Sequence, residues 1–100
     1  MFGFHFSRVD GISMSPVIPD GSYVLINTWR IKQKLTPNRI VKVQHSRYGE
    51  IIKRIEHIDN LGKIWLKGEH PNSVSTAEIG PITKGDIIGI VNLTVKPSSA

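Results

Sequence analysis

The sequence predicts a mainly β protein built on an antiparallel, coiled sheet. Apolar and polar residues alternate with a period of two along several segments, and the apolar positions are rich in the β-branched residues that strands favour. Residues that form turns separate these segments at short intervals, which is typical of antiparallel strands joined by short loops. A helical pattern is weak and short, and it covers Thr28–Leu35.

The first strand is expected where Phe2, Phe4 and Phe6 alternate with smaller or polar residues. Further strands are predicted over Tyr23–Asn27, Arg39–Gln44, Ile51–Ile58, Lys63–Lys67 and Ile87–Thr94. Turns are marked by Pro19-Asp20-Gly21, Thr36-Pro37-Asn38, Tyr48-Gly49, Asn60-Leu61-Gly62 and Lys84-Gly85-Asp86. Two long stretches, Asp10–Pro19 and Gly68–Pro81, resist strand assignment, and irregular stretches of this length are commonly functional.

The size and composition describe one globular domain. A chain of 100 residues buries one modest core, so residues 1–100 are expected to form a single domain, with residues 95–100 as a frayed tail. The absence of cysteine excludes disulfides, thiolate metal sites and cysteine nucleophiles. The histidines lack the spacing of a metal site, and no apolar run approaches the roughly 20 residues of a membrane helix. We therefore expect no metal, no cofactor and no stable membrane insertion. The first residues lack the pattern of a signal peptide, which favours the cytoplasm.

The first irregular stretch contains the segment Gly11-Ile12-Ser13-Met14-Ser15-Pro16. A serine placed between a glycine and a Met-x-Pro sequence is expected in a tight turn that presents its hydroxyl. By itself this pattern is weak, because a serine beside glycine and proline is usually only a turn residue.

The strand predicted over Ile51–Ile58 carries a lysine between isoleucines. In a period of two, Ile51, Lys53 and Ile55 share one face of the strand. Desolvation between apolar neighbours favours the neutral amine, which can accept a proton from a serine hydroxyl. The competing interpretation is that the lysine stem lies on apolar surface while the ammonium reaches water.

Taken in order along the chain, these segments resemble the catalytic core of type I signal peptidases and LexA-type self-cleaving repressors. The resemblance rests on Gly-x-Ser-Met-x-Pro, Pro-Asp-Gly-x-Tyr-Val-Leu, RIVKV and IIKRI, and it extends from about Val9 to Val91. It implies an antiparallel coiled sheet or small, partly open barrel. It also implies that Ser13 is the nucleophile and Lys53 its general base. Their neighbours Gly11, Ile12, Met14 and Ile52 are expected to contact the substrate.

The second irregular stretch agrees with this family in part. Gly68, Pro71 and the Gly80-Pro81 pair match its pattern, whereas Glu69-His70 replaces an Asp-Asn pair and nothing matches an Asp-Ser-Arg sequence. In relatives a hydroxyl from this region hydrogen-bonds the lysine. Counting back from Gly80 assigns that role to Ser73, and Ser75 is the alternative.

The position two residues before the nucleophile is Gly11, so the resemblance implies an oxyanion hole made of backbone N–H groups, chiefly that of Ser13. No cleavage site for self-cleavage precedes Ser13. We therefore expect an enzyme that acts in trans on an extended segment of a protein or peptide, such as a leader. The short peptidases that mature nickel superoxide dismutase are the most similar subfamily, since they share Lys-Arg-Ile and Trp-Leu-x-Gly-x-x-Pro.

Other interpretations remain open. His57 with Asp59 could supply a triad base for Ser13. The domain could also be a non-catalytic relative that works as a binding or dimerisation module, and an oligomer is compatible with either. The net charge of +5 allows a barrel that binds single-stranded nucleic acid, but scattered lysines and arginines favour an ordinary solvated basic face. The sequence does not identify the substrate.

Overall fold

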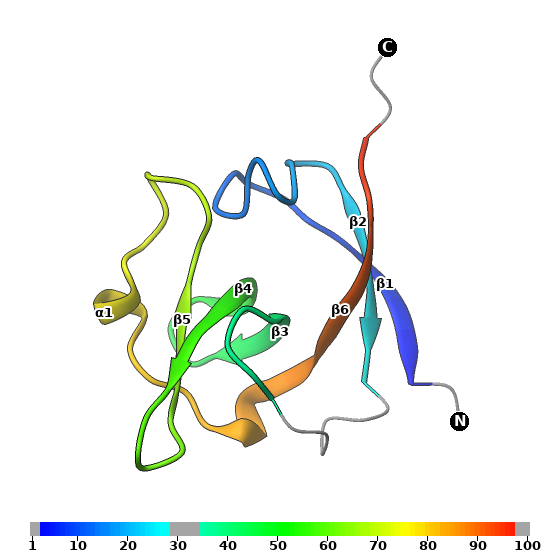
Figure 1. Ribbon diagram of the computed structural model, residues 1–100. Coiled ribbons are helices and arrows are strands. Elements are labelled where there is room, and N and C mark those ends of the chain that lie inside the picture. The colour runs from blue at the N-terminus through cyan, green and yellow to red at the C-terminus, as the bar shows by residue number, and fades with distance from the viewer. Residues whose placement is uncertain (1–2, 29–34, 98–100) are drawn as a thin grey trace.

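The computed structural model describes residues 3–28 and 35–97, which form an antiparallel sheet with two short helices (Figure 1). The strands are β1 (Phe4–Arg8), β2 (Tyr23–Asn27), β3 (Ile40–His45), β4 (Gly49–Ile58), β5 (Ile64–Lys67) and β6 (Ile87–Val95). Helix α1 spans Thr76–Ile79 and the 3-10 helix η1 spans Lys84–Asp86. The strand order is β1-β2-β6-β3-β4-β5, so β1 and β5 are the edges of one open, six-stranded sheet. The predicted mainly β, antiparallel fold is confirmed.

Strand β6 joins two halves of this sheet. It pairs with β2 on one side and with β3 on the other, although β2 and β3 follow one another along the chain. Two apolar clusters lie on the two sides of this junction. One cluster packs β3, β4 and β5 under α1, and its buried residues include Val43, Ile55 and Leu66. The other packs β2 against the β1–β2 connection through Val24, Ile26, Met14 and neighbours. The second cluster therefore ties the connection that carries Ser13 to the sheet.

Predicted and observed strands agree closely, and the differences have local causes. β4 begins at Gly49, two residues earlier than expected, because the hairpin pairs His45 with Gly49. The stretch Gly68–Pro81 contains α1, which begins where the Ser75 hydroxyl accepts a hydrogen bond from the Glu78 N–H at 3.1 Å. Most of the predicted helical segment Thr28–Leu35, and residues 98–100 of the predicted tail, lie outside the described residues.

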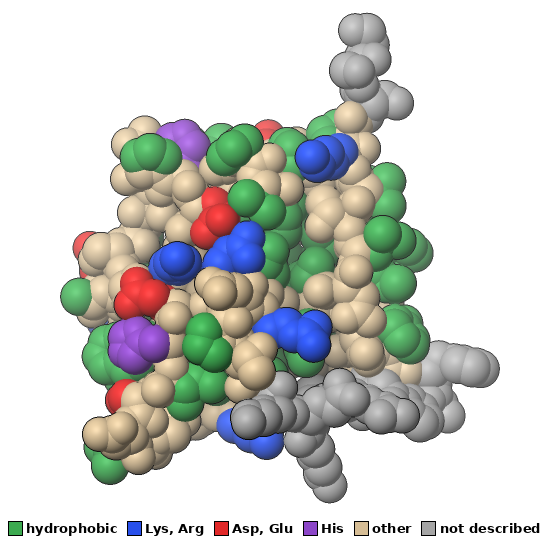
Figure 2. Space-filling model, viewed as in Figure 1, with side chains coloured by type: hydrophobic (Ala, Val, Ile, Leu, Met, Phe, Trp, Pro, Cys, Tyr) green, Lys and Arg blue, Asp and Glu red, His purple; other side chains and the backbone are tan. Residues whose placement is uncertain are grey.

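The outer face of β1, β2 and β6 is apolar and exposed. Phe4 and Phe6 are 50% and 60% exposed, and Tyr23, Leu93 and Val95 are also exposed on the paired strands. Figure 2 shows hydrophobic side chains along the side of the molecule where these strands lie. The alternation of phenylalanines thus marks a strand whose apolar face is not covered within the described residues. No helix in these residues is long and apolar enough to span a membrane.

Candidate active site

Ser13 lies in the connection between β1 and β2, which is held by its own hydrogen bonds. Gly11 has a φ of 99°, a conformation that favours glycine, and its N–H donates to Asp20 Oδ1 at 2.8 Å. The Ser15 N–H donates to the Ile12 carbonyl at 2.9 Å, and Met14 is only 1% exposed. This combination turns Met14 into the core and leaves Ser13, the preceding residue, half-buried at the surface of the loop.

The chain after β5 fixes the backbone of Ser13 from the other side. The Ser13 carbonyl accepts two hydrogen bonds, from the Glu69 N–H at 2.6 Å and the His70 N–H at 3.0 Å. Gly68 makes this approach possible, because a Cβ there would collide with the Ser73 side chain and lie 2.8 Å from the Ser13 carbonyl oxygen. The loop that begins at Gly68 is therefore docked directly on the residue predicted as the nucleophile.

An ion pair attaches the same loop to β4. Arg54 Nη2 lies 3.1 Å from Glu69 Oε1, and the two side chains are 21% and 18% exposed. Arg54 Nη1 also donates to the Asn38 carbonyl at 2.7 Å. Arg54 is the neighbour of Lys53 on β4, and Glu69 also donates its N–H to the Ser13 carbonyl. The Arg54–Glu69 ion pair therefore links the strand that carries Lys53 to the backbone of Ser13.

Lys53 lies on an interior strand and is buried. Its Cα partner across the β3–β4 ladder is Val41, and Ile55 on its own face is 0% exposed. Lys53 itself is 6% exposed, and within the described residues no carboxylate forms an ion pair with it. Burial lowers the pKa of the Lys53 ammonium, because desolvation disfavours its charged form.

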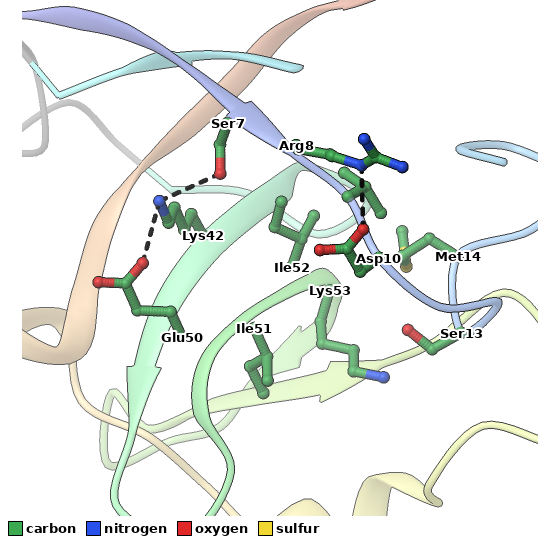
Figure 3. A pocket seen from close by; sticks show the side chains of 11 residues that line it. Ser7, Arg8, Asp10, Ser13, Met14, Lys42, Glu50, Ile51, Ile52 and Lys53 are labelled. Atoms are coloured by element: carbon green, nitrogen blue, oxygen red, sulfur yellow. Dashed lines mark hydrogen bonds and ion pairs between the residues drawn. The ribbon is translucent and has the colours of Figure 1, made fainter. Parts of the chain in front are cut away.

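Ser13 and Lys53 line the same cavity, which has a volume of about 230 Å³. Figure 3 shows the Lys53 amine and the Ser13 hydroxyl pointing toward one another, with Met14 above the serine in this view. The remaining lining comes from β1 and the two residues after it, from β3 and from the start of β4: Ser7, Arg8, Val9, Asp10, Lys42, Glu50, Ile51 and Ile52. The cavity has room for one or two side chains and is too small for a larger ligand.

The opposite end of the cavity holds a second lysine. Lys42 Nζ lies 3.1 Å from Glu50 Oε1 and 3.5 Å from His5 Nε2, and it donates to Ser7 Oγ at 3.3 Å. The Lys42 side chain is 12% exposed. Lys42 is therefore neutralised by a partner, in contrast to Lys53.

Two backbone edges border the cavity. β1 pairs with β2 alone, so its other side is free among the described strands. The start of β4, from Glu50 to Lys53, pairs with β3, whereas β5 pairs with β4 only from Arg54 onward. Free N–H and C=O groups on these edges can pair with an added extended segment.

The other predicted residues are placed in different ways. Met14 and Ile52 line the cavity, whereas Gly11 and the half-exposed Ile12 do not. The Ser73 side chain lies against Gly68, next to the Ser13 backbone. The Ser75 hydroxyl caps α1 instead. The structure thus brings Ser73 to the neighbourhood of Ser13 and gives Ser75 a local structural contact.

The triad alternative has a different geometry. A register shift between Ile55 and His57 interrupts the alternation of β4. His57 is half-exposed and stacks on Trp65 with ring centroids 5.7 Å apart, and it does not line the cavity. Asp59 accepts hydrogen bonds from Trp65 Nε1 at 3.0 Å and from two N–H groups of its own turn, and the Trp65 bond lowers the pKa of the Asp59 carboxyl. The contacts of both residues are within the β4–β5 hairpin, away from Ser13.

Sequence reasoning missed the Arg54–Glu69 pair and the Lys42–Glu50 pair. The first could have been found from the basic residue beside Lys53 and the acidic residue after Gly68, once the two segments were expected to meet. The second lies on β3 and β4 at positions that are diagonal neighbours in the hairpin register.

Comparison with known families and proteins gives a single result. The chain matches the family described as Peptidase S24-like over residues 4–92, which covers every strand except the last residues of β6. It matches none of the curated proteins. The matched segment contains both Ser13 and Lys53 and the loop that begins at Gly68. The chain belongs to the Peptidase S24-like family.

Proposed function

We propose that the protein is a serine endopeptidase in which Ser13 is the nucleophile and Lys53 is the general base. One observation carries this proposal: a serine on a fixed loop and a desolvated lysine, which has no carboxylate partner among the described residues, point toward one another in one cavity. A lysine must be neutral to accept a proton, and burial favours the neutral amine. Family membership supports a hydrolase of the peptidase type.

The chemistry uses these two side chains and the backbone. Ser13 Oγ attacks the carbonyl carbon of the scissile peptide bond while its proton passes to Lys53 Nζ. The oxyanion accepts a hydrogen bond from the Ser13 N–H, which has no acceptor among the described residues. The Lys53 ammonium then protonates the leaving nitrogen as the C–N bond breaks. A water molecule, deprotonated by Lys53, hydrolyses the resulting ester and regenerates the hydroxyl.

The substrate is an extended segment of another protein. The free edges of β1 and of the start of β4 border the cavity and supply backbone partners for such a segment. The cavity accepts the side chains nearest the cut, and small residues such as Ala or Gly fit beside Met14 and Ile52. Removal of a leader in trans is the reaction that these features support.

The test is cleavage of a library of ten-residue peptides that carry Ala or Gly at the central bond, with products identified by mass spectrometry. Ser13→Ala should abolish cleavage and leave the thermal unfolding midpoint unchanged, since loss of the attacking atom costs several orders of magnitude. Ser15→Ala, a serine two residues away in the same loop, is the matched control and should retain activity. A Ser13→Ala protein within tenfold of the parent rate would exclude Ser13 as the nucleophile.

A further inference from the structure

At the end of the cavity opposite Ser13, the Glu50 carboxylate has one oxygen that can accept further hydrogen bonds. Glu50 contacts Lys42 through Oε1 at 3.1 Å, and its other carboxylate oxygen has no hydrogen-bond or ion-pair partner among the described residues. The Glu50 side chain is 56% exposed, whereas that of Lys42 is 12% exposed. A group that enters this end of the cavity therefore meets the carboxylate first.

Lys42 has little capacity left for a ligand. An ammonium has three N–H donors, and three acceptors surround it: Glu50 Oε1, Ser7 Oγ and His5 Nε2. A substrate carboxylate would have to displace one of these acceptors and would lie beside Glu50. A substrate cation can instead add to the free oxygen of Glu50, at greater distance from the Lys42 ammonium.

Glu50 lies within reach of a substrate held at Ser13. It precedes Lys53 by three residues on β4, which corresponds to about 10 Å along an extended strand. A peptide paired with the free edge of β4 advances by the same distance per residue. Residues three apart on a strand point to opposite faces, so the peptide residue opposite Glu50 is three residues from the one opposite Lys53 and points to the face of β4 that carries Glu50. A side chain two or three residues from the scissile bond is thus brought to Glu50. Figure 3 shows Glu50 and Lys42 at one end of the cavity and Ser13 at the other, with Ile51 and Ile52 between them.

We propose that Glu50 selects substrates with a lysine or arginine two or three residues from the cleaved bond. This inference rests on the proposed peptidase function and adds a substrate class to it. The cation of the substrate pairs with the free oxygen of Glu50, and Lys42 beneath it holds the carboxylate in place. An acidic side chain at the same position is disfavoured, because it meets Glu50 as a like charge.

The experiment uses fluorogenic peptides of alanine and glycine in which one position at a time is Lys, Met or Glu, on both sides of the central bond. At one position two or three residues from the cut, kcat/KM should be about three- to tenfold higher for Lys than for Met, and lowest for Glu. Glu50→Gln should abolish this order, and Glu50→Lys should reverse it. Glu56→Gln, a half-exposed carboxylate on the same strand outside the cavity, should leave it unchanged.

Binding separates failure of this inference from failure of the peptidase proposal. If no peptide is cleaved, the proposed function is wrong, and anisotropy of the same labelled peptides with the Ser13→Ala protein then decides about Glu50. Tighter binding of the lysine peptides, lost in a Ser13→Ala, Glu50→Gln protein, supports the inference. Equal kcat/KM or equal binding for Lys and Met at every position overturns it, and so does a lysine preference that persists in Glu50→Gln.

Discussion

The two ends of the cavity contain the same residue type in opposite environments. Lys53 is buried beside isoleucines with no carboxylate partner in the described residues, and its pKa is lowered. Lys42, on the neighbouring strand, has Glu50 at 3.1 Å and Ser7 at 3.3 Å. Since desolvation favours the neutral amine, Lys53 is suited to accept a proton, whereas Lys42 is held in an ion pair with Glu50. Position on the sheet, not residue type, gives the two lysines these different environments.

Replacement of each lysine by methionine gives the largest expected contrast. Lys53→Met keeps the length and apolar stem of the side chain and removes the base. If Lys53 is the base, the substitution should abolish peptide cleavage, a loss of about 10³-fold or more, and leave the fold equally or more stable. Lys42→Met should change kcat by less than tenfold and unfolding free energy by about 1 kcal/mol or less, because its partner Glu50 is half-exposed. Cleavage rates and thermal unfolding of the same two samples check this.

The proposed difference between the two lysines is contradicted if Lys42→Met lowers the cleavage rate more than Lys53→Met does. An active Lys53→Met enzyme whose rate follows a group near pH 6.5, the usual pKa of histidine, would assign the base to a histidine. An inactive but folded Lys42→Met enzyme would show that both lysines take part in the reaction.

The pH dependence should carry the signature of Lys53. Activity should rise with pH through the lowered pKa of this amine, which lies below the usual lysine value of about 10.4. The unfolded chain binds the proton more readily, so the unfolding free energy should decrease as pH falls from about 10.4 to the folded pKa, and should lose no more below it. Lys53→Met should remove this slope, whereas Lys42→Met should retain it. If the unfolding free energy of the parent and of Lys53→Met changes equally between these pH values, the desolvation argument is contradicted.

Two hydroxyls in the loop after β5 provide a smaller and finer comparison. The family resemblance gives the Ser73 hydroxyl the role of orienting Lys53, so Ser73→Ala should slow cleavage about 10–1000-fold. Ser75→Ala should affect cleavage less, because its hydroxyl caps α1 and its loss costs about 1 kcal/mol of helix stability. Parallel rate and unfolding measurements distinguish the two. Should Ser75→Ala prove the more damaging to the rate, the register of the loop assumed for Ser73 is wrong.

The sequence was sufficient to predict the strands and to place Lys53 and Ile55 on the same face of one strand. The period of two in IIKRI places Lys53 and Ile55 together, and both are buried. Turn residues such as Tyr48-Gly49 locate the hairpin that fixes the register of β3 against β4. These features are local, and local propensity and periodicity determine them.

Contacts between distant segments could not be read in the same way. The exposure of Phe4 and Phe6 depends on which elements cover the sheet, and an alternating pattern does not specify this. The meeting of Glu69 with Ser13 and Arg54 depends on the path of the loop after β5, which has no periodicity. The bulge that turns His57 out of the alternation of Lys53 is likewise invisible in the residue order.

The position of β6 has a consequence for the synthesis of the protein. It is the last of the described strands, and it alone among them joins β2 to β3. When the ribosome has just translated Lys53, β6 has not yet been synthesised. The two parts of the sheet that carry Ser13 and Lys53 are then not joined. Because domains complete their long-range pairing only after the final strand emerges, the nascent chain lacks an assembled cavity until residues 87–95 are free. The order of the strands thereby delays assembly of the cavity until residues 87–95 have been synthesised.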